Sequence, residues 1–137
     1  MIVADASVVL KWVLPAEPGA EAALAVRSRH LSGVDRIAAP VLLFYEVANV
    51  LALTPRLTEG EALEACDSLR LSGLAVYAPG AREMHRAVEL ARQARLSAYD
   101  AAYVALAEAL GCSFVTADRK LARKLQRVAV GCEVRTI

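Results

Sequence analysis

The segment Ser113-Phe-Val-Thr-Ala-Asp-Arg-Lys-Leu121 joins a short apolar run to a helix-like run through a single aspartate. Ser113–Val115 is too short for a helix and predicts a buried strand, whereas the residues from Ala117 to Arg127 predict a helix. The start of the chain, Met1-Ile-Val-Ala-Asp-Ala-Ser7, has the same order of apolar strand, aspartate and helix. Such strand-to-helix junctions are typical of α/β proteins with a parallel sheet.

Short strands and helices alternate through the remaining sequence as well. Further strands are expected over Ile37–Ala39, Leu74–Tyr77 and Glu133–Ile137. Further helices are expected over Ala6–Leu14, from a turn at Glu17-Pro18-Gly19 to about Leu31, over Pro40–Leu53, over Thr58–Ser72, from Pro79-Gly80 to about Arg95, and over Ala98–Leu110. No repeat, linker or low-complexity segment separates these elements. Residues 1–137 therefore predict a single α/β domain with helices on both faces of a parallel sheet.

The composition excludes several classes of protein. With 57% hydrophobic and 23% charged residues, the chain has enough apolar side chain to fold, which excludes general disorder. The net charge of +1 gives no strong attraction to nucleic acid or membranes, so binding either would need a local patch or a bound ion. Cys66, Cys112 and Cys132 are widely spaced, which argues against a disulfide framework or a cysteine zinc site. They are expected to be small buried hydrophobic residues in a reducing compartment.

The longest apolar tract, from Ile37 to Pro55, does not predict a membrane span. Glu46 lies near its middle and Asn49 follows one turn later, whereas a spanning helix needs about 18 or more apolar residues with few or no charges. The start of the chain also lacks the basic segment of a signal peptide. We therefore expect a buried helix in a cytoplasmic protein that does not enter a membrane.

Two carboxylates directly follow predicted strands. Asp5 comes after the first strand, and Asp118 comes after Ser113–Val115. In open α/β sheets, the reactive groups lie beyond the carboxyl ends of the strands. Aspartate is also a favoured N-cap at the start of a helix, and Thr116 could share that role with Asp118. Capping alone is therefore an equally good explanation of each aspartate.

Glu46 lies in a helix that is apolar almost all round, which indicates a buried element. Asn49 lies three residues further on and shares the same face of that helix. A buried carboxylate without a partner costs several kcal/mol or becomes protonated, so Glu46 predicts a nearby partner. The alternative is that this face of the helix simply meets solvent.

Asp100 lies in the first turn of the predicted helix Ala98–Leu110. Ser97 and Asp100 resemble a capping box with aspartate in place of glutamate, which is a purely structural explanation. Asp100 is also at the positive end of the helix dipole, where a carboxylate can stay ionised and point toward the sheet edge. The spacing predicts a separate buried stripe on this helix, made of Tyr99, Tyr103, Leu106 and Leu110.

Four carboxylates near one crevice repel each other unless cations hold them together. Oxygen ligands of this kind suit Mg²⁺ or Mn²⁺, which keep several waters and use substrate phosphates as further ligands. One or two such ions can activate a water and stabilise both the entering and the leaving oxygen during phosphodiester cleavage. The spacing alone leaves open that the carboxylates are scattered over the surface.

Four segments carry these acids in order along the chain. They are Met-Ile-Val-Ala-Asp-Ala-Ser from residue 1, Ala-Pro-Val-Leu-Leu-Phe-Tyr-Glu-Val-Ala-Asn-Val-Leu from residue 39, Leu-Ser-Ala-Tyr-Asp-Ala-Ala-Tyr-Val-Ala-Leu-Ala from residue 96, and Phe-Val-Thr-Ala-Asp-Arg-Lys-Leu from residue 114. Together they resemble the signatures of PIN-domain proteins, most closely the toxins of VapBC-type toxin–antitoxin pairs. Each segment alone is weak, but the four together are specific and cover essentially the whole chain.

The resemblance implies a three-layer α/β/α sandwich with a mostly parallel sheet and a ribonuclease that depends on Mg²⁺ or Mn²⁺. It implies a homodimer and a small antitoxin protein whose C-terminal segment blocks the site. Some relatives carry another acid after the fourth aspartate, where this chain has Arg119 and Lys120, which weakens the argument for a second metal ion. By position, the resemblance assigns metal binding and catalysis to Asp5, Glu46, Asp100 and Asp118, and supporting roles to Ser7, Asn49 and Thr116.

Basic side chains follow Asp118 in the next helix. Arg119, Lys120 and Arg123 are candidates for contacting RNA phosphates at the rim of the site. A solvated basic face without a binding role is the alternative explanation.

Three other classes of protein are alternatives to a PIN-domain ribonuclease. A receiver-type signalling domain is also a small α/β module with an acidic Mg²⁺ pocket, but it needs paired acids after the first strand, where Asp5 stands alone. A haloacid-dehalogenase-type phosphatase needs a second aspartate where Ser7 stands. A PIN-like scaffold that binds a partner without cleaving RNA stays open as a third alternative.

Overall fold

A computed structural model describes residues 1–14 and 18–137. The strands are β1 (Ile2–Ala4), β2 (Ile37–Pro40), β3 (Ala75–Tyr77), β4 (Ser113–Thr116) and β5 (Val134–Thr136). The helices are α1 (Ala6–Val13), α2 (Ala20–Leu31), α3 (Leu42–Ala52), α4 (Glu59–Arg70), α5 (Ala81–Ala94), α6 (Ala98–Leu110) and α7 (Arg119–Leu125). Each predicted strand and helix is present, and the differences are at their ends. Glu17, in the turn predicted before α2, lies outside the described residues.

The five strands form one parallel sheet in the order β3-β2-β1-β4-β5. The central strand is β1, where Val3 pairs with Ala38 of β2 on one side and Phe114 of β4 on the other. The chain moves outward from β1 to β3 and then crosses back to build β4 and β5 on the opposite side. The direction therefore reverses between β1 and β4, which is where open α/β sheets form their binding crevice.

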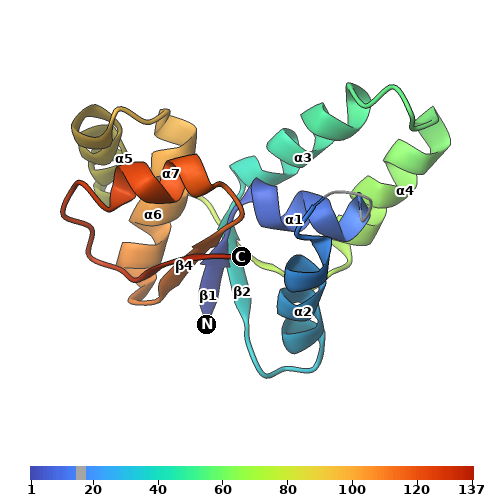
Figure 1. Cartoon of the computed structure of the whole chain (residues 1–137), viewed down its shortest axis with the longest axis horizontal. Helices are drawn as coiled ribbons and strands as arrows, with labels where there is room; N and C mark the ends of the chain where they lie inside the picture. Colours follow the sequence, from blue (N-terminus) through green and yellow to red (C-terminus); the bar gives the residue numbers. More distant parts are fainter. Residues whose placement is uncertain (15–17) are drawn as a thin grey trace.

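Helices cover both faces of the sheet, as the sequence predicts. Helices α1 to α4 lie on one side, and α5 to α7 lie on the other (Figure 1). Connections between parallel strands are almost always right-handed, so the reversal of direction after β3 also moves the connecting helices to the other face. The core between these layers contains fully buried residues from strands and helices, including Val3, Phe114, Leu43 and Val104.

The start of α3 differs from the prediction. Pro40 is the last residue of β2 rather than the first residue of the helix. It pairs with Tyr77 of β3, and the N–H of Val41 then donates to the Tyr77 carbonyl at 2.9 Å. The strand pairing therefore continues through the proline, and the helix begins at Leu42. Among residues 1–14 and 18–137, no helix is long and apolar enough to cross a membrane.

The start of α7 also differs from the prediction. Ala117 is not helical, and its N–H donates to Ser7 Oγ at 2.8 Å in the junction after β4. Asp118 is the N-cap, and the helix begins at Arg119. At the start of α4, Thr58 and Glu61 form a capping box, since they exchange hydrogen bonds between side chain and backbone.

Tyr99 does not belong to the buried stripe of α6, contrary to the prediction. Its side chain is 68% exposed, whereas Tyr103 and Leu106 are buried. Tyr99 lines an open groove together with Met84 and Val88 of α5, which are also exposed. Helical spacing identifies one face of a helix, but it does not say how much of that face neighbouring elements cover.

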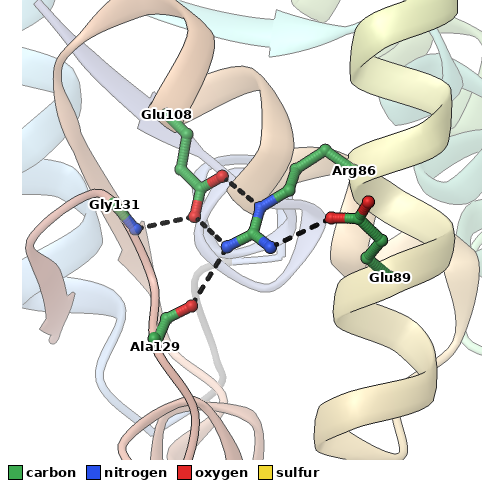
Figure 2. A network of polar contacts seen from close by, with 5 residues as sticks. All are labelled: Arg86, Glu89, Glu108, Ala129 and Gly131. Atoms are coloured by element: carbon green, nitrogen blue, oxygen red, sulfur yellow. Dashed lines mark hydrogen bonds and ion pairs between the residues drawn. The ribbon is translucent and has the colours of Figure 1, made fainter.

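A half-buried arginine on α5 connects three parts of the chain (Figure 2). Arg86 donates from Nε and Nη2 to the two carboxylate oxygens of Glu108 on α6, at 2.6 and 2.9 Å. Its Nη2 also donates to the carbonyl of Ala129 at 3.0 Å, and its Nη1 donates to Glu89 at 3.3 Å. The N–H of Gly131 donates to Glu108 at 2.7 Å. The network therefore fixes the segment before β5 against α5 and α6.

His30 connects the segments that lead into β2 and β3. Its Nδ1 accepts from the N–H of Ile37 at 3.2 Å, and its Nε2 lies 3.0 Å from the Ser72 carbonyl. Because the Ile37 N–H can only donate, the ring proton belongs on Nε2, which then donates to Ser72. We expect His30→Phe to lower the free energy of unfolding by about 1–2 kcal/mol, because both backbone groups lose their partner.

Urea unfolding measures this effect. The control is His85→Phe on the exposed side of α5, which should change the free energy of unfolding by less than about 0.5 kcal/mol. Equal losses for the two variants would contradict a bridging role for His30.

Candidate active site

Asp5 is the most buried of the four candidate carboxylates. It follows β1, is 5% exposed, and caps α1 through Oδ1, which accepts from the N–H of Val8 at 3.3 Å. The Ser7 hydroxyl also donates to Oδ1, at 2.5 Å. Burial raises the pKa of Asp5 to about 6, although hydrogen bonds from Ser7, Thr116 and the backbone oppose this increase. A carboxylate with a strongly raised pKa in this position is more typical of a functional site than of a simple helix cap.

Ser7 connects Asp5 to the end of β4. Its Oγ lies 3.3 Å from Oγ1 of the fully buried Thr116. Thr116 Oγ1 in turn accepts from the N–H of Asp118 at 2.9 Å. The ends of β1 and β4 therefore form one hydrogen-bonded junction, which we call the β1–β4 junction and define by Asp5, Ser7, Thr116 and Asp118.

Asp118 caps α7, so the capping explanation holds for both aspartates of the junction. Its Oδ1 accepts from the N–H groups of Lys120 at 2.7 Å and Leu121 at 3.1 Å. The bond from Val8 to Asp5 and the bonds from Lys120 and Leu121 to Asp118 all end on one carboxylate oxygen, Oδ1. Capping and metal binding are therefore compatible at these two positions.

Glu46 lies on α3 and meets Tyr103, which lies on α6. The Tyr103 side chain is 2% exposed, and its hydroxyl donates to Glu46 Oε2. Glu46 thus has the partner that its apolar helix predicts. Burial raises the pKa of Glu46, the hydrogen bond from Tyr103 opposes this, and the carboxylates of Asp100 and Asp5 raise it further. The sequence predicts Tyr103 only as a core residue, because no local pattern signals a contact between two distant helices.

Asp100 lies at the start of α6 beside Ser97. The N–H of Asp100 donates to Ser97 Oγ at 3.0 Å, which confirms Ser97 as the cap. The Asp100 carboxylate accepts from the Ser97 hydroxyl at 2.8 Å, rather than from the backbone N–H as in a full capping box. Its charge raises the pKa of Glu46, so the two carboxylates are within electrostatic range of each other. Asn49 is exposed on α3, one turn after Glu46.

The donor set of these residues is suited to a hard divalent cation. The carboxylates of the β1–β4 junction, α3 and α6 lie beyond the carboxyl ends of the strands. The junction also contains the hydroxyls of Ser7 and Thr116. A cation would relieve the repulsion that raises the pKa of Glu46. Within residues 1–14 and 18–137, no group of three or more His, Cys, Asp or Glu side chains is close enough to hold one ion. The ligand types fit a hard cation that keeps several waters and binds only one or two carboxylates directly.

The basic candidates lie on the exposed surface of α7. Arg119, Lys120 and Arg123 are all exposed, and Arg119 directly follows Asp118. Arg123 donates from Nε to the carbonyl of Arg119 at 3.2 Å, within its own helix. This exposure agrees both with a solvated basic face and with a phosphate-binding rim.

The raised pKa of Asp5 predicts a pH dependence of stability. A carboxyl group with a pKa of about 6 in the folded protein, against an ordinary 3.8, binds its proton more tightly when folded. The protein should therefore lose stability as the pH rises from about 4 to about 6, and the loss should persist at neutral pH. In EDTA at about pH 7, we expect Asp5→Asn to raise the free energy of unfolding by about 2 kcal/mol, because asparagine keeps the capping oxygen without the buried charge.

Urea unfolding at about pH 4 and about pH 7 measures this prediction. The two proteins should have nearly equal stability at the lower pH, where Asp5 is protonated in the folded state. A variant that is no more stable than the natural protein at the higher pH would contradict the proposed cost of burying the charge.

A family model of the PIN domain matches residues 2–125 of the chain. The chain belongs to the PIN-domain family. Within this family its sequence is similar to VapC ribonucleases: Ribonuclease VapC9 of Mycobacterium tuberculosis is 38% identical over 124 residues, which cover 88% of each protein. Ribonuclease VapC3 of Pyrobaculum aerophilum is 36% identical over 129 residues, covering 90% of this chain and 93% of that relative. The resemblance predicted from the four acidic segments is therefore confirmed.

Solved structures agree with the PIN-domain fold. The structure of VapBC2 from Rickettsia felis, bound to a DNA fragment from its promoter, matches with a TM-score of 0.71 at 15% identity. The match covers 100% of this chain and 99% of that chain. This likeness concerns the fold alone, and it confirms the predicted α/β sandwich with its parallel sheet.

Proposed function

We propose that this PIN-domain protein cleaves RNA phosphodiester bonds with the help of Mg²⁺ or Mn²⁺, as the toxin of a toxin–antitoxin pair. The observation that carries the proposal is the β1–β4 junction, which holds Asp5 and Asp118 at the crevice position of a parallel sheet. The charges of Asp5 and Asp100 both act on Glu46. The ribonuclease activity named for VapC9 and VapC3 supports the same reaction.

The proposed roles follow from the contacts of each side chain. Asp5, Asp100 and Asp118 would bind the cation directly or through water, and Glu46 would hold a water or a second ion. A bound divalent cation would activate water and offset negative charge at the phosphate. Tyr103 would orient Glu46, since burial and the neighbouring Glu46 raise the pKa of Tyr103 and keep its hydroxyl protonated as a donor.

Ser7 and Thr116 are proposed to support the site rather than to react. The Ser7 hydroxyl donates to Asp5, which leaves its oxygen free to accept from Ala117. The Thr116 oxygen accepts from Asp118. These bonds fix the two aspartates relative to each other, which limits the rearrangement needed when a cation binds.

RNA would reach the acidic crevice only after a cation has offset its charge. The exposed Arg119, Lys120 and Arg123 would then contact phosphates beside Asp118. Because the net charge of the chain is only +1, binding would depend on this local group and would weaken steeply as salt increases.

A cognate antitoxin and a second copy of this chain are the proposed protein partners. The Rickettsia felis structure contains VapBC2 on promoter DNA, which supports pairing with an antitoxin. Large apolar side chains are exposed on α3, α5 and α6, including Tyr45, Met84 and Tyr99. Exposed apolar surface of this kind is typical of sites where other proteins bind.

Removing divalent cations tests the proposed reaction. The purified chain is incubated with a pool of structured RNAs in Mn²⁺, in Mg²⁺ and in EDTA, and the fragments are resolved by electrophoresis. We expect cleavage with either metal, its loss in EDTA, and its recovery when excess Mn²⁺ is added back.

The alternative functions predict different results. Cleavage that persists in EDTA would contradict metal dependence. Binding of Mn²⁺ without cleavage of any RNA would favour a PIN-like scaffold. Transfer of phosphate from acetyl phosphate to the chain would instead favour a receiver-type module.

A further inference from the structure

Cys112 directly precedes β4, and Cys132 lies two residues before the adjacent strand β5. In the pairing of β4 with β5, Phe114 lies opposite Val134, Val115 opposite Arg135, and Thr116 opposite Thr136. The same offset, continued toward the starts of the strands, places Cys112 opposite Cys132. Neighbouring strands lie about 4.8 Å apart, and disulfides join residues whose Cα atoms are about 4.4–6.8 Å apart.

Both cysteines face the same side of the sheet. Side chains alternate along a strand, so Cys112 shares a face with Phe114, and directly opposed residues point the same way. Phe114 packs beside Tyr103 of α6, with ring centroids 6.5 Å apart. Cys112 and Cys132 therefore lie on the α6 side, where both are half-buried against the core.

Backbone hydrogen bonds hold the two positions in place. The N–H of Cys112 donates to the carbonyl of Ala107 at the end of α6, at 3.0 Å. On the other segment, Gly131 donates to Glu108 at 2.7 Å, and the N–H of Phe114 donates to the carbonyl of Glu133 at 2.8 Å. Figure 2 shows the same segment anchored by Arg86 through the Ala129 carbonyl. The residues on both sides of Cys132 are thus fixed next to the end of α6 and the start of β4.

We infer that Cys112 and Cys132 are a built-in disulfide site, which is oxidised reversibly by a low-molecular-weight disulfide. A thiolate of one cysteine attacks a sulfur of the small disulfide, forming a mixed disulfide and releasing one small thiol. The second cysteine then attacks the protein sulfur of that mixed disulfide and releases the other small thiol. The two protein thiols are oxidised, the small disulfide is reduced, and the two thiol protons end on the released thiols.

The surroundings of the pair make this reaction slow at neutral pH. Burial raises the pKa of Cys112, and the charge of the nearby chain N-terminus opposes this increase. Burial, with further increases from Glu108 and Cys112 and an opposing effect of Arg86, raises the pKa of Cys132 to about 11. Because the thiolate is the reacting form, the pair should be oxidised faster at about pH 9 than at about pH 7.

The bond would close a loop that contains Thr116, Asp118 and the whole of α7. It would form near the amino ends of β4 and β5, whereas the β1–β4 junction lies at the carboxyl end of β4. We therefore expect oxidation to stabilise the C-terminal part of the fold more than it changes the site. A loop of this length predicts a rise in Tm of about 5–10 °C, because the cross-link restricts the unfolded chain.

The test uses the full purified chain under native conditions with oxidised glutathione at about pH 8.5. Remaining thiols are alkylated with iodoacetamide, and peptides are identified by mass spectrometry without reduction. The expected product has lost two hydrogen atoms in mass, contains a linked Cys112–Cys132 peptide, and carries an alkylated Cys66. In Cys132→Ser the linked peptide should disappear, while Cys66→Ser should oxidise like the natural protein.

The melting temperature and the conditions under which the bond forms provide two further tests of the disulfide site. The oxidised protein should melt about 5–10 °C higher, and dithiothreitol should reverse this rise. Separate glutathione adducts on Cys112 and Cys132 without a linked peptide would overturn the inference. Formation of the bond only after unfolding in urea would also overturn it, because the native fold would then not bring the two thiols together.

Discussion

Replacing Asp100 with asparagine should lower RNA cleavage by about 100-fold or more, because the loss of a metal-binding carboxylate removes several kcal/mol of transition-state stabilisation. The fold should be retained. The backbone N–H of Asp100 donates to Ser97 Oγ, and this cap does not depend on the side chain. Asparagine also keeps a carbonyl oxygen that can accept from the Ser97 hydroxyl. The measurement is the initial rate of cleavage of one defined RNA at saturating Mn²⁺, with circular dichroism as the check on folding.

The matched control is Asp67→Asn, which removes the same charge from an exposed position on α4. Its cleavage rate should equal that of the natural protein within about twofold, because Asp67 lies away from the β1–β4 junction. Full activity in Asp100→Asn would show that Asp100 lies outside the site or that a contaminating nuclease cleaves the RNA. Equal loss in both variants would show that the loss is not specific to the proposed site.

Arg86→Ala should lower the free energy of unfolding by about 3 kcal/mol. The change removes both bonds to Glu108, the bond to the Ala129 carbonyl and the ion pair with Glu89. The Glu108 side chain is only 14% exposed, so its charge would be left half-buried with the Gly131 N–H as its remaining donor in this network. In the natural protein, burial tends to raise the pKa of Glu108, but the bonds from Arg86 and Gly131 outweigh it and keep the pKa below its usual range. Urea unfolding at neutral pH measures the difference.

Arg29→Ala is the control for this prediction. Arg29 donates to Asp35 at the same N–O distance, 2.6 Å, but its side chain is 59% exposed and the pair lies on the surface. Exposed pairs contribute about 0–1 kcal/mol, so this variant should lose much less stability. Similar losses in the two variants would show that burial of the Arg86–Glu108 pair does not determine its contribution.

The order and type of the elements could be predicted from short patterns. An apolar run of three or four residues followed by an aspartate and an amphipathic run identifies a strand, a cap and a helix, as at Asp5 and Asp118. The ends of elements were less predictable. Pro40 stays in β2, where Val41 bonds to Tyr77 on another strand, and Ala117 lies before α7, where Ser7 accepts its N–H. Both boundaries depend on partners that are far away in the sequence.

The candidate site was predictable as residue types and not as contacts. The sequence predicts a partner for Glu46 but not that the partner is Tyr103, because the bond joins helices on opposite faces of the sheet. It also predicts capping and metal binding as competing explanations of Asp5 and Asp118. In the structure the bonds from Val8, Lys120 and Leu121 end on Oδ1 of the two aspartates, and a carboxylate has a second oxygen, so both explanations are compatible.

The sequence by itself determined the class of fold, the family and which acidic residues are candidates for the site, because strand length, helix period and the four acidic segments are local properties of the chain. The tertiary structure decided which groups meet: Ser7 with Thr116, Tyr103 with Glu46, and Arg86 with Glu108. It also decided that Tyr99 is exposed and that Asp5 is buried deeply enough to raise its pKa. Burial and pairing depend on how layers from distant parts of the chain pack together, and no local pattern encodes that packing.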